Sequence, residues 1–458
     1  MKRFTIIILS LLLSVALSAQ VKYVFYFIGD GMGLNHVLMT EMYREAMGME
    51  PLCFTSFPTA SYATTFSTDS DVTDSAASGT ALACGSKTSN GRIGVDANGE
   101  TLVSVAEQAK AKGLKVGVLT NVTANHATPA AFCAHQNSRN NVHEISLDML
   151  QNAFDFYGGS GMAKDKKDKN GEKLQSVMEQ FRSAGYTVCN PTEWKKRSKK
   201  IKKVLMLPGE GQSIEFALDM EAGDPENHIR LVEQTDAAIS LLSRNNRKGF
   251  FLMVEGGRID YTAHSNDAAA TIAEINEFNE AIKSALSFYH KHPDETLILI
   301  TADHETGGLT LNPRKKGQLA TLSAQKHSIS HISKKLRDML KDDENLNWVD
   351  VQEFLRDEFG FWDKIELSEK QEDRLKEVYE QTIAQDKAGS VVDLYSNNAT
   401  IVSVASQILS EICCLHWSTS GHSSGYVPVY AIGKGASLFS SKNDNALIPQ
   451  KLREIVRY

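Results

Sequence analysis

The chain has 458 residues, of which 42% are hydrophobic and 23% charged, a composition typical of a globular protein with a sizeable core. Its formal net charge is −7, and the absence of a surplus of Lys and Arg argues against nucleic acid as a partner. The length permits two or three domains, although large α/β enzymes of this size often form one unit.

The N-terminal stretch has the pattern of an export signal. Lys2 and Arg3 form a positive start, residues 4–17 are apolar, and small residues at 16–19 suit cleavage before Gln20. A membrane anchor is the alternative, but the apolar run is short for a span, no second run follows, and no cysteine follows the cleavage region as a lipoprotein requires. We therefore predict a signal peptide at residues 1–19, no stable membrane span, and a periplasmic or secreted protein.

Apolar stretches rich in β-branched and aromatic residues alternate with helical stretches. Residues 21–28, VKYVFYFI, form a continuous apolar run typical of a buried strand, and a glycine-rich turn and a helix at about 35–47 follow. Further strands are expected at 61–66, 115–119, 154–157, 250–254, 296–301 and 428–432, and further helices at 102–112 and 268–289. This alternation predicts an α/β fold with a large, mostly parallel sheet and helices on both faces.

Three stretches differ from this pattern. Residues 164–173 are polar, as in a solvated loop, and residues 195–203, KKRSKKIKK, are basic enough to attract an anionic surface, although an exposed charged segment is the simpler interpretation. Residues 311–415 are mostly polar and helical, with helices expected at 328–341, 348–358 and 368–381. We interpret 20–458 as one catalytic domain that an accessory subdomain at about 311–415 interrupts.

The six cysteines offer no metal-binding pattern. None has C-x-x-C spacing, and Cys84 and Cys133 lie in small, apolar contexts typical of buried thiols. Export makes disulfides possible, but the spacing favours no particular pairing.

The stretch at 71–91, DVTDSAASGTALACGSKTSNG, predicts a helix whose side chains are almost all small. Asp74 is a good N-cap, because its carboxylate can accept from the N–H groups of the first turn. Ser75 then lies at the helix N-terminus, where the N–H groups and the helix dipole favour an anion. By itself, Ser75 is either a second capping residue or a nucleophile that becomes negatively charged. The small residues indicate close approach of other backbone or of a bound group.

Four further stretches place polar side chains where predicted strands end or begin. Taken singly, each is an ordinary turn or connection, but the ends of parallel strands meet at one edge of a sheet. Together they supply Asp30, Glu255, Asp260, His264, Asp303, His304 and His422. Carboxylates and imidazoles in this number suit a two-metal centre with room for a third cation. Ser75 beside such a centre would be an activated nucleophile, and Arg139 could hold two phosphate oxygens.

At this point the chain resembles the alkaline phosphatase family. The matching stretches follow the family order between residue 21 and about residue 433: YFIGDGMG, VTDSAASGTALACGSKTSNGRIGVD, HATPAAFCAHQNSR, FYGGSG, VEGGRIDYTAH, TADHETGG and TSGHSSG. The resemblance implies an enzyme that hydrolyses phosphate monoesters through a phosphoserine on Ser75. It also implies that Arg139 orients the phosphate and that the protein is a homodimer.

The resemblance further implies two zinc ions and one magnesium ion. Asp260, His264 and His422 would hold the zinc that activates the leaving-group oxygen and later the water, and Asp303 and His304 would hold the second zinc with Ser75 and Asp30. Thr128, Glu255 and Asp30 would hold the magnesium. The chain departs from one bacterial form of the family, which has Asp two residues before this Thr, because His126 stands there instead. His126 puts the identity of the third ion in doubt, since it could bind zinc or contact magnesium only through water.

Two other functions remain open at this stage. A related enzyme for diesters or sulfates is one, but sulfatases need a C-x-P-x-R type of nucleophile region, and Arg139 favours a terminal phosphate. An exported metal- or phosphate-binding protein without turnover is the other. The stretches contain no obvious acid for the leaving group, which is consistent with catalysis under alkaline conditions.

Overall fold

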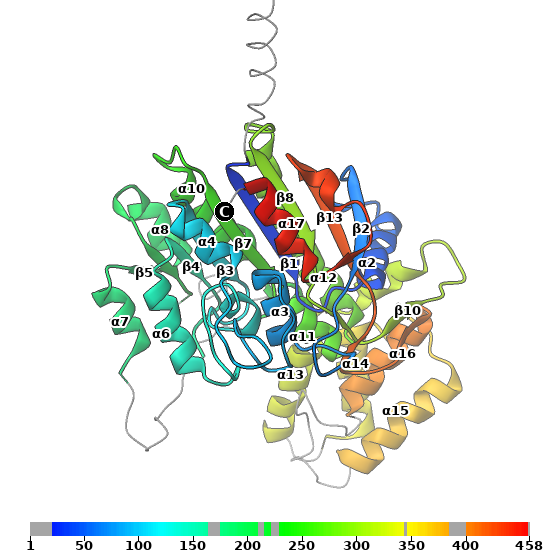
Figure 1. Ribbon diagram of the computed structural model, residues 1–458. Helices are drawn as coiled ribbons and strands as arrows, with labels where there is room; N and C mark the ends of the chain where they lie inside the picture. Colours follow the sequence, from blue (N-terminus) through cyan, green and yellow to red (C-terminus); the bar gives the residue numbers. More distant parts are fainter. Residues whose placement is uncertain are drawn as a thin grey trace, which may run out of the picture.

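The computed structural model describes residues 21–163, 175–208, 215–220, 229–342, 346–383 and 400–456 (Figure 1). The predicted signal peptide at 1–19 and the predicted loop at 164–173 lie outside these residues. No helix among the described residues is long and apolar enough to cross a membrane.

The centre of the molecule is a ten-stranded sheet with the strand order β14-β2-β13-β8-β1-β7-β3-β4-β6-β5. β13 pairs antiparallel with both of its neighbours, and the other pairs are parallel, so the predicted mostly parallel sheet is confirmed. Its strands are β1 (Tyr23–Gly29), β2 (Thr59–Thr64), β3 (Lys115–Thr120), β4 (Phe156–Gly158), β5 (Thr187–Cys189), β6 (Val204–Met206), β7 (Phe250–Gly256), β8 (Thr296–Thr301), β13 (Val427–Gly433) and β14 (Asn443–Asp444).

Helices cover both faces of this sheet (Figure 1). Those that surround it are α2 (Leu34–Ala46), α3 (Ser75–Cys84), α4 (Val105–Ala111), α5 (Ala127–Ala130), α6 (Val142–Asn152), α7 (Val177–Ser183), α8 (Pro191–Arg197), α9 (Ala217–Met220), α10 (Leu231–Ser243), α11 (Arg258–His264), α12 (Ala268–Tyr289) and α17 (Leu447–Val456). The 3₁₀ turns η1 (Ser198–Lys200) and η5 (Ala436–Phe439) follow α8 and β13.

The central strand β1 shows why both faces are covered. Side chains alternate between the faces of a strand. Phe27 meets Phe278 of α12 on one face, with ring centroids 5.7 Å apart, whereas the Tyr26 hydroxyl donates to the Leu82 carbonyl of α3 on the other. Because both faces are buried, the strand reads as a continuous apolar run in the sequence.

The accessory region contains a second hydrophobic cluster, separate from that of the large sheet. The three helices expected there are present within one residue at each end, and a fourth, α16, completes the group. The described elements between β8 and β13 are β9 (Glu305–Thr306), β10 (Leu309–Leu311), η3 (Gln318–Ala324), α13 (Ile329–Asp342), α14 (Trp348–Phe359), α15 (Glu369–Thr382), α16 (Ile401–Ile412), β11 (Leu415–Trp417) and β12 (His422–Ser423), of which β9 and β12 lie outside the accessory region. β10 pairs with β11 where the chain leaves and rejoins the large sheet. The subdomain boundary at 311–415 stays a prediction.

Local capping explains where one predicted helix differs. We expected a helix from residue 102, but α4 begins at Val105, because the Ser104 hydroxyl accepts from the Glu107 N–H and the Glu107 carboxylate accepts from the Ser104 N–H. The basic run at 195–203 forms the end of α8 and the turn η1, with most of its side chains exposed. All six cysteines are unbonded thiols, and Cys84 and Cys133 are buried as expected.

Candidate metal centre and active site

The carboxyl ends of three adjacent strands bring acidic side chains together. β1 lies between β7 and β8, and its residue Ile28 is in register with Glu255 of β7 and with Thr301 of β8. Asp30 follows β1 directly and Asp303 follows β8 after one residue, so both lie at the same sheet edge as Glu255. Open α/β sheets hold ligands at this edge.

The short helix α11 extends this group. Asp260 and His264 are four residues apart and therefore share one helix face, and His264 Nε2 lies 3.3 Å from Asp260 Oδ2. His264 Nδ1 donates to the Ser420 carbonyl and His422 Nδ1 donates to the Thr73 carbonyl, since a carbonyl only accepts. Both rings therefore turn Nε2 inward, where the two Nε2 atoms are 3.2 Å apart.

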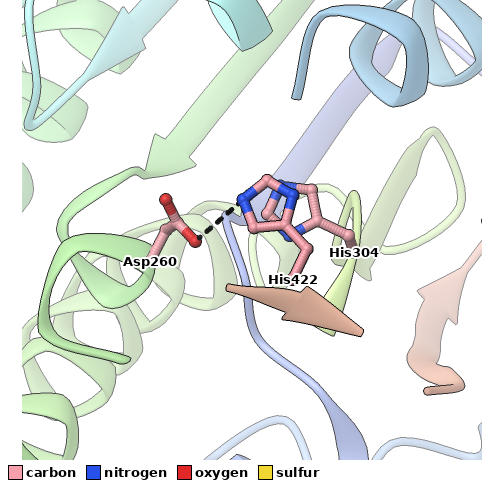
Figure 2. A group of neighbouring side chains, drawn as sticks. All are labelled: Asp260, His304 and His422. Atoms are coloured by element: carbon pink, nitrogen blue, oxygen red, sulfur yellow. Dashed lines mark ion pairs between the residues drawn. The ribbon is translucent and has the colours of Figure 1, made fainter. Parts of the chain in front are cut away.

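Three sets of side chains place ligand atoms within 4.8 Å of one another among the described residues. Figure 2 shows the first, Asp260, His304 and His422, whose side chains converge from three different segments. The other two are Asp30 with Asp303 and His304, and Asp30 with His126 and Glu255. Neighbouring sets share His304 or Asp30, so together they form one continuous group with room for three cations.

The buried atoms of these sets fit cations. Among the described residues, several buried atoms of these sets have no hydrogen-bond partner: both carboxylate oxygens of Asp30 and of Glu255, Asp303 Oδ2 and His126 Nδ1. The same holds for Oγ1 of Thr128, the further ligand that the sequence predicts. Burying an unpaired carboxylate is strongly unfavourable, and coordination of a cation removes the penalty. Oxygen atoms suit magnesium, and imidazole with carboxylate suits zinc.

Electrostatics in the centre also favour positive charge. Burial, together with the charge of Asp303, raises the pKa of Asp30 well above its ordinary value, and burial with the charge of Asp260 raises the pKa of Asp303 to about 8. Burial also acts to raise the pKa of Asp260, but the hydrogen bond and charge of His264 hold it well below its ordinary value. Burial lowers the pKa of His304, which keeps its imidazole neutral and able to bind a cation.

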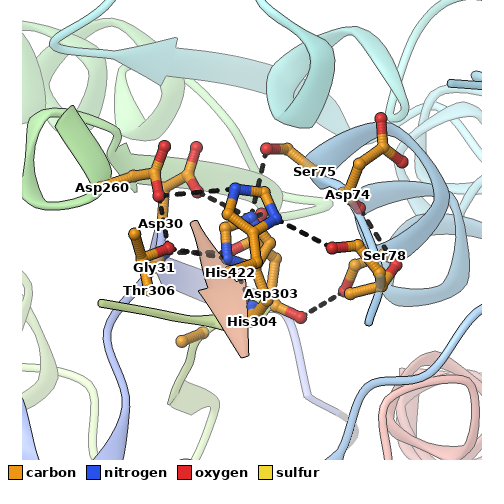
Figure 3. Close-up of polar contacts among 12 residues, drawn as sticks. Asp30, Gly31, Asp74, Ser75, Ser78, Asp260, Asp303, His304, Thr306 and His422 are labelled. Carbon is orange, nitrogen blue, oxygen red and sulfur yellow. Dashed lines mark hydrogen bonds and ion pairs between the residues drawn. The ribbon is translucent and has the colours of Figure 1, made fainter. Parts of the chain in front are cut away.

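Ser75 begins α3 beside these ligands (Figure 3). Asp74 is the N-cap, as expected, and its Oδ1 accepts from the Ala77 N–H at 2.9 Å. The Ser75 hydroxyl is buried and lies 3.2 Å from His304 Nε2. The small side chains let α3 approach other backbone, because a Cβ on Gly79 would lie 3.2 Å from the Cα of Thr128.

Arg139 reaches the same end of α3. Its Nη1 donates to Asp74 Oδ2 at 3.1 Å, and its Nη2 lies 3.3 Å from His126 Nε2. Burial acts to lower the pKa of Arg139, but the charge and hydrogen bond of Asp74, together with the charges of Asp30 and Asp260, raise that pKa. The guanidinium therefore stays charged beside Ser75. This second role of Asp74 was not predicted, although its place next to Ser75 and the candidate phosphate ligand Arg139 were available signals.

The structure thus brings the predicted site residues into one region. The contacts above connect all of them except Thr128, which lies two residues beyond His126 on α5 with its hydroxyl buried. The arrangement combines oxygen and nitrogen ligands for several cations, a serine at a helix N-terminus and a fixed guanidinium. These groups lie at the carboxyl edge of a mostly parallel sheet, and bound cations, a helix N-terminus and a guanidinium all attract negative charge. The fold and the site therefore define an α/β enzyme suited to an anionic substrate.

Comparison with known proteins identifies the family. Residues 21–458 match the family model described as alkaline phosphatase, and the chain belongs to the alkaline phosphatase family. Alkaline phosphatase 3 of Bacillus subtilis (strain 168) is 30% identical over 456 residues, which cover 96% of this chain and 90% of that protein. The chain is therefore a phosphatase of a metal-dependent family, which confirms the resemblance seen in the sequence.

Solved structures agree with this assignment. The cold-active alkaline phosphatase of Shewanella sp. superposes with a TM-score of 0.75 at 29% identity, covering 95% of this chain and 99% of that chain. The alkaline phosphatase of the Antarctic bacterium TAB5 gives a TM-score of 0.65 at 26% identity, covering 96% and 99%. A histidine-to-aspartate variant of the TAB5 enzyme was solved with magnesium bound in its M3 site.

Proposed function

We propose that the protein hydrolyses phosphate monoesters through a phosphoserine formed on Ser75, at a centre of two zinc ions and one magnesium ion. The observation that carries this proposal is the position of Ser75. Its hydroxyl lies at a helix N-terminus, 3.2 Å from His304 Nε2 and beside buried carboxylate oxygens that have no hydrogen-bond partner. A nucleophile there would meet both an anion-binding helix end and bound cations.

The family resemblance divides the cations among these residues. Asp260, His264 and His422 would hold one zinc, and Asp303 and His304, with Asp30 and Ser75, would hold the second. When bound, the two zinc ions would lower the pKa of the Ser75 hydroxyl and neutralise charge on the attacking and leaving oxygens.

The third set suits magnesium. Asp30, Glu255 and Thr128 offer oxygen atoms, and His126 Nδ1 lies 3.8 Å from Glu255 Oε1. The magnesium in the M3 site of the TAB5 variant supports a third ion in a related enzyme. Because His126 contributes nitrogen rather than oxygen, we propose that magnesium binds more weakly here than it would beside an aspartate.

The chain's own residues define the two steps of the reaction. Ser75 Oγ forms a bond to phosphorus as the bond from phosphorus to the alcohol oxygen breaks, and a water oxygen later forms the bond to phosphorus that releases Ser75. Arg139 would donate both Nη groups to two non-bridging phosphate oxygens, with Asp74 holding its guanidinium in place. The first N–H groups of α3 would stabilise the same oxygens.

The experiment compares Ser75→Ala with a matched control. The mature chain, loaded with zinc and magnesium, should release phosphate from a nitrophenyl monoester, and Ser75→Ala should lower kcat by at least about 1,000-fold. Ser287→Ala, an exposed serine on α12, should leave kcat unchanged. Acid quenching and mass spectrometry should find phosphate on the Ser75 peptide.

The substrate class has its own readout in the same assay. The diester and the sulfate ester of the same alcohol should react far more slowly than the monoester. Each of them carries one negative charge where the monoester carries two, and the diester also has a second alcohol group to accommodate, so the cations and Arg139 would stabilise both less. Full activity of Ser75→Ala, or a diester preferred to the monoester, would contradict the proposal. If the protein bound zinc but hydrolysed no ester, it would be a metal-binding protein rather than an enzyme.

Export and assembly complete the proposal. The pattern of residues 1–19 supports a periplasmic or secreted enzyme. A homodimer is supported by exposed apolar side chains at one side of the sheet, where Leu34 and Leu38 lie one turn apart on α2 and Tyr62 packs on Tyr426 with ring centroids 4.8 Å apart. The Leu34 N–H donates to the Tyr426 carbonyl, which joins the two pairs. Light scattering should give a dimer for the mature chain and a monomer for Leu38→Asp.

A further inference from the structure

A buried hydroxyl links two of the three ligand sets. Thr306 is fully buried on the short strand β9, directly behind the metal ligands. Its Oγ1 lies 2.5 Å from Asp260 Oδ1 and 3.2 Å from His304 Nδ1 (Figure 3). Thr306 lies within the matching stretch TADHETGG, but the sequence analysis assigned it no role.

The direction of both hydrogen bonds follows from counting protons. The Asp260 carboxylate accepts only, so the single hydroxyl proton of Thr306 is donated to Asp260 Oδ1. Thr306 Oγ1 must then accept from His304 Nδ1, which means that Nδ1 carries the proton of the imidazole. The other nitrogen, Nε2, is left with its lone pair toward Ser75 Oγ, Asp30 and Asp303.

The main chain fixes the hydroxyl in this place. The Thr306 N–H donates to the Gly31 carbonyl at 3.1 Å, and Thr306 is paired in register with His422 across the two-stranded ladder of β9 and β12. The side chains of Thr306 and Asp260 pack closely on the backbone of Gly31. A Cβ at Gly31 would lie 2.9 Å from Thr306 Oγ1 and 2.8 Å from Asp260 Oδ1. The main chain at Thr306 is therefore held beside Gly31, with the side chain against Asp260 and His304.

We infer that Thr306 is a positioning residue, whose hydroxyl sets the tautomer of His304 and the orientation of Asp260 so that both proposed zinc sites are formed together. The inference rests on the proposed function. Partners behind metal ligands commonly raise metal affinity 10- to 100-fold. The magnesium set, Asp30, His126 and Glu255, contains neither residue that Thr306 contacts.

The test uses two substitutions at this position and one far from it. Thr306→Val keeps the shape and removes the hydroxyl, and Thr306→Ser keeps the hydroxyl. Thr235→Val is the matched control, because Thr235 is also fully buried and its hydroxyl donates to the Leu231 carbonyl of its own helix. Zinc and magnesium affinities of the purified enzyme are measured by competition with a chelator and elemental analysis.

We expect Thr306→Val to raise the zinc dissociation constants of both sites by about 10- to 100-fold. The magnesium affinity should stay within about twofold, and Thr306→Ser and Thr235→Val should match the unchanged chain. Three results would overturn the inference: zinc affinity unaltered in Thr306→Val, an equal loss in Thr306→Ser, or equal weakening of zinc and magnesium, which indicates a general structural defect.

A second measurement needs no folded valine variant. In the zinc enzyme labelled with ¹⁵N-histidine, His304 Nδ1 should carry a slowly exchanging proton whose resonance shifts in Thr306→Ser. A rapidly exchanging or absent Nδ1 proton would also overturn the inference. Failure of the proposed function looks different, because the unchanged chain would then bind no zinc or Ser75→Ala would keep its activity.

Discussion

Asp74 and Arg139 are joined by a hydrogen-bonded ion pair at the start of α3. Asp74 Oδ2 accepts from Arg139 Nη1 at 3.1 Å while Oδ1 of the same carboxylate caps the helix at the Ala77 N–H. One carboxylate therefore fixes both the guanidinium that would hold phosphate and the helix end that carries Ser75.

Two substitutions separate these roles. Asp74→Asn keeps an oxygen for the cap but removes the charge that holds Arg139, so inorganic phosphate should inhibit about tenfold less tightly, equivalent to about 1.4 kcal/mol. Asp74→Ala should show the same loss and lower the free energy of unfolding by about 1 kcal/mol more, because the cap is lost as well. Inhibition constants and urea unfolding measure the two effects. Equal stability of the two variants would contradict the capping role.

Removal of metal should destabilise the protein as well as inactivate it. Without cations, the buried carboxylates of Asp30, Glu255 and Asp303 lie together without compensating charge. A chelator should abolish phosphate release and lower the midpoint of thermal unfolding by several degrees, and zinc with magnesium should restore both. Calorimetry with and without chelator provides the measurement, and an unchanged midpoint would count against buried metal sites.

His126 should control the identity of the third ion. His126→Asp adds a carboxylate beside Glu255, where His126 Nδ1 now lies 3.8 Å from Glu255 Oε1. An oxygen ligand favours magnesium over zinc, so the variant should bind magnesium about tenfold more tightly. Elemental analysis after dialysis against both ions measures the preference. Greater zinc occupancy in His126→Asp would contradict this assignment.

Glu274, which is not one of the proposed metal ligands, should make the stability of the fold depend on pH. It is buried on α12, and burial raises its pKa to about 7, although Arg258 partly opposes the shift. Between about pH 4.5 and pH 7 the unfolded carboxyl has lost its proton while the folded one retains it, so the folded state binds more protons and its stability falls as pH rises.

Because Gln does not titrate, Glu274→Gln isolates this contribution. The free energy of unfolding of the unchanged chain, relative to Glu274→Gln, should fall by about 1–3 kcal/mol between pH 4.5 and pH 7 and stay level above it. Urea unfolding of the metal-loaded proteins across this range provides the measurement. A difference that does not change with pH would refute the raised pKa.

The C-terminal part of the chain should support the nucleophile helix. Buried Asn445 donates from Nδ2 to Ser78 Oγ at 2.9 Å, and Ser78 in turn donates to the Asp303 carbonyl. Lys87 Nζ donates to Asn445 Oδ1. Asn445→Ala removes one hydrogen bond from Ser78 and one from Lys87, although each keeps another partner, and should lower the free energy of unfolding by about 1–3 kcal/mol. Asn98→Ala, at an exposed turn, is the control for urea unfolding and should have no effect.

The apolar pattern of the sequence predicted the centre of the fold well. β8 and α12 begin and end at the predicted residues, because a strand buried on both faces and a long helix each give a continuous local signal. The edge strands β5 and β14, and β6 next to β5, were not predicted. They have two or three residues each, too few to show a period, and their pairing depends on the neighbouring strand.

The sequence by itself determined the central strands, the long helix α12 and the residue types at the strand ends, because periodicity and turn chemistry act over a few neighbouring residues. Only the tertiary structure decided which of those side chains contact one another. The second partner of Asp74 is 65 positions away at Arg139, and Thr306 contacts Asp260 across 46 positions. Such contacts arise from packing between distant segments, and no local pattern records them.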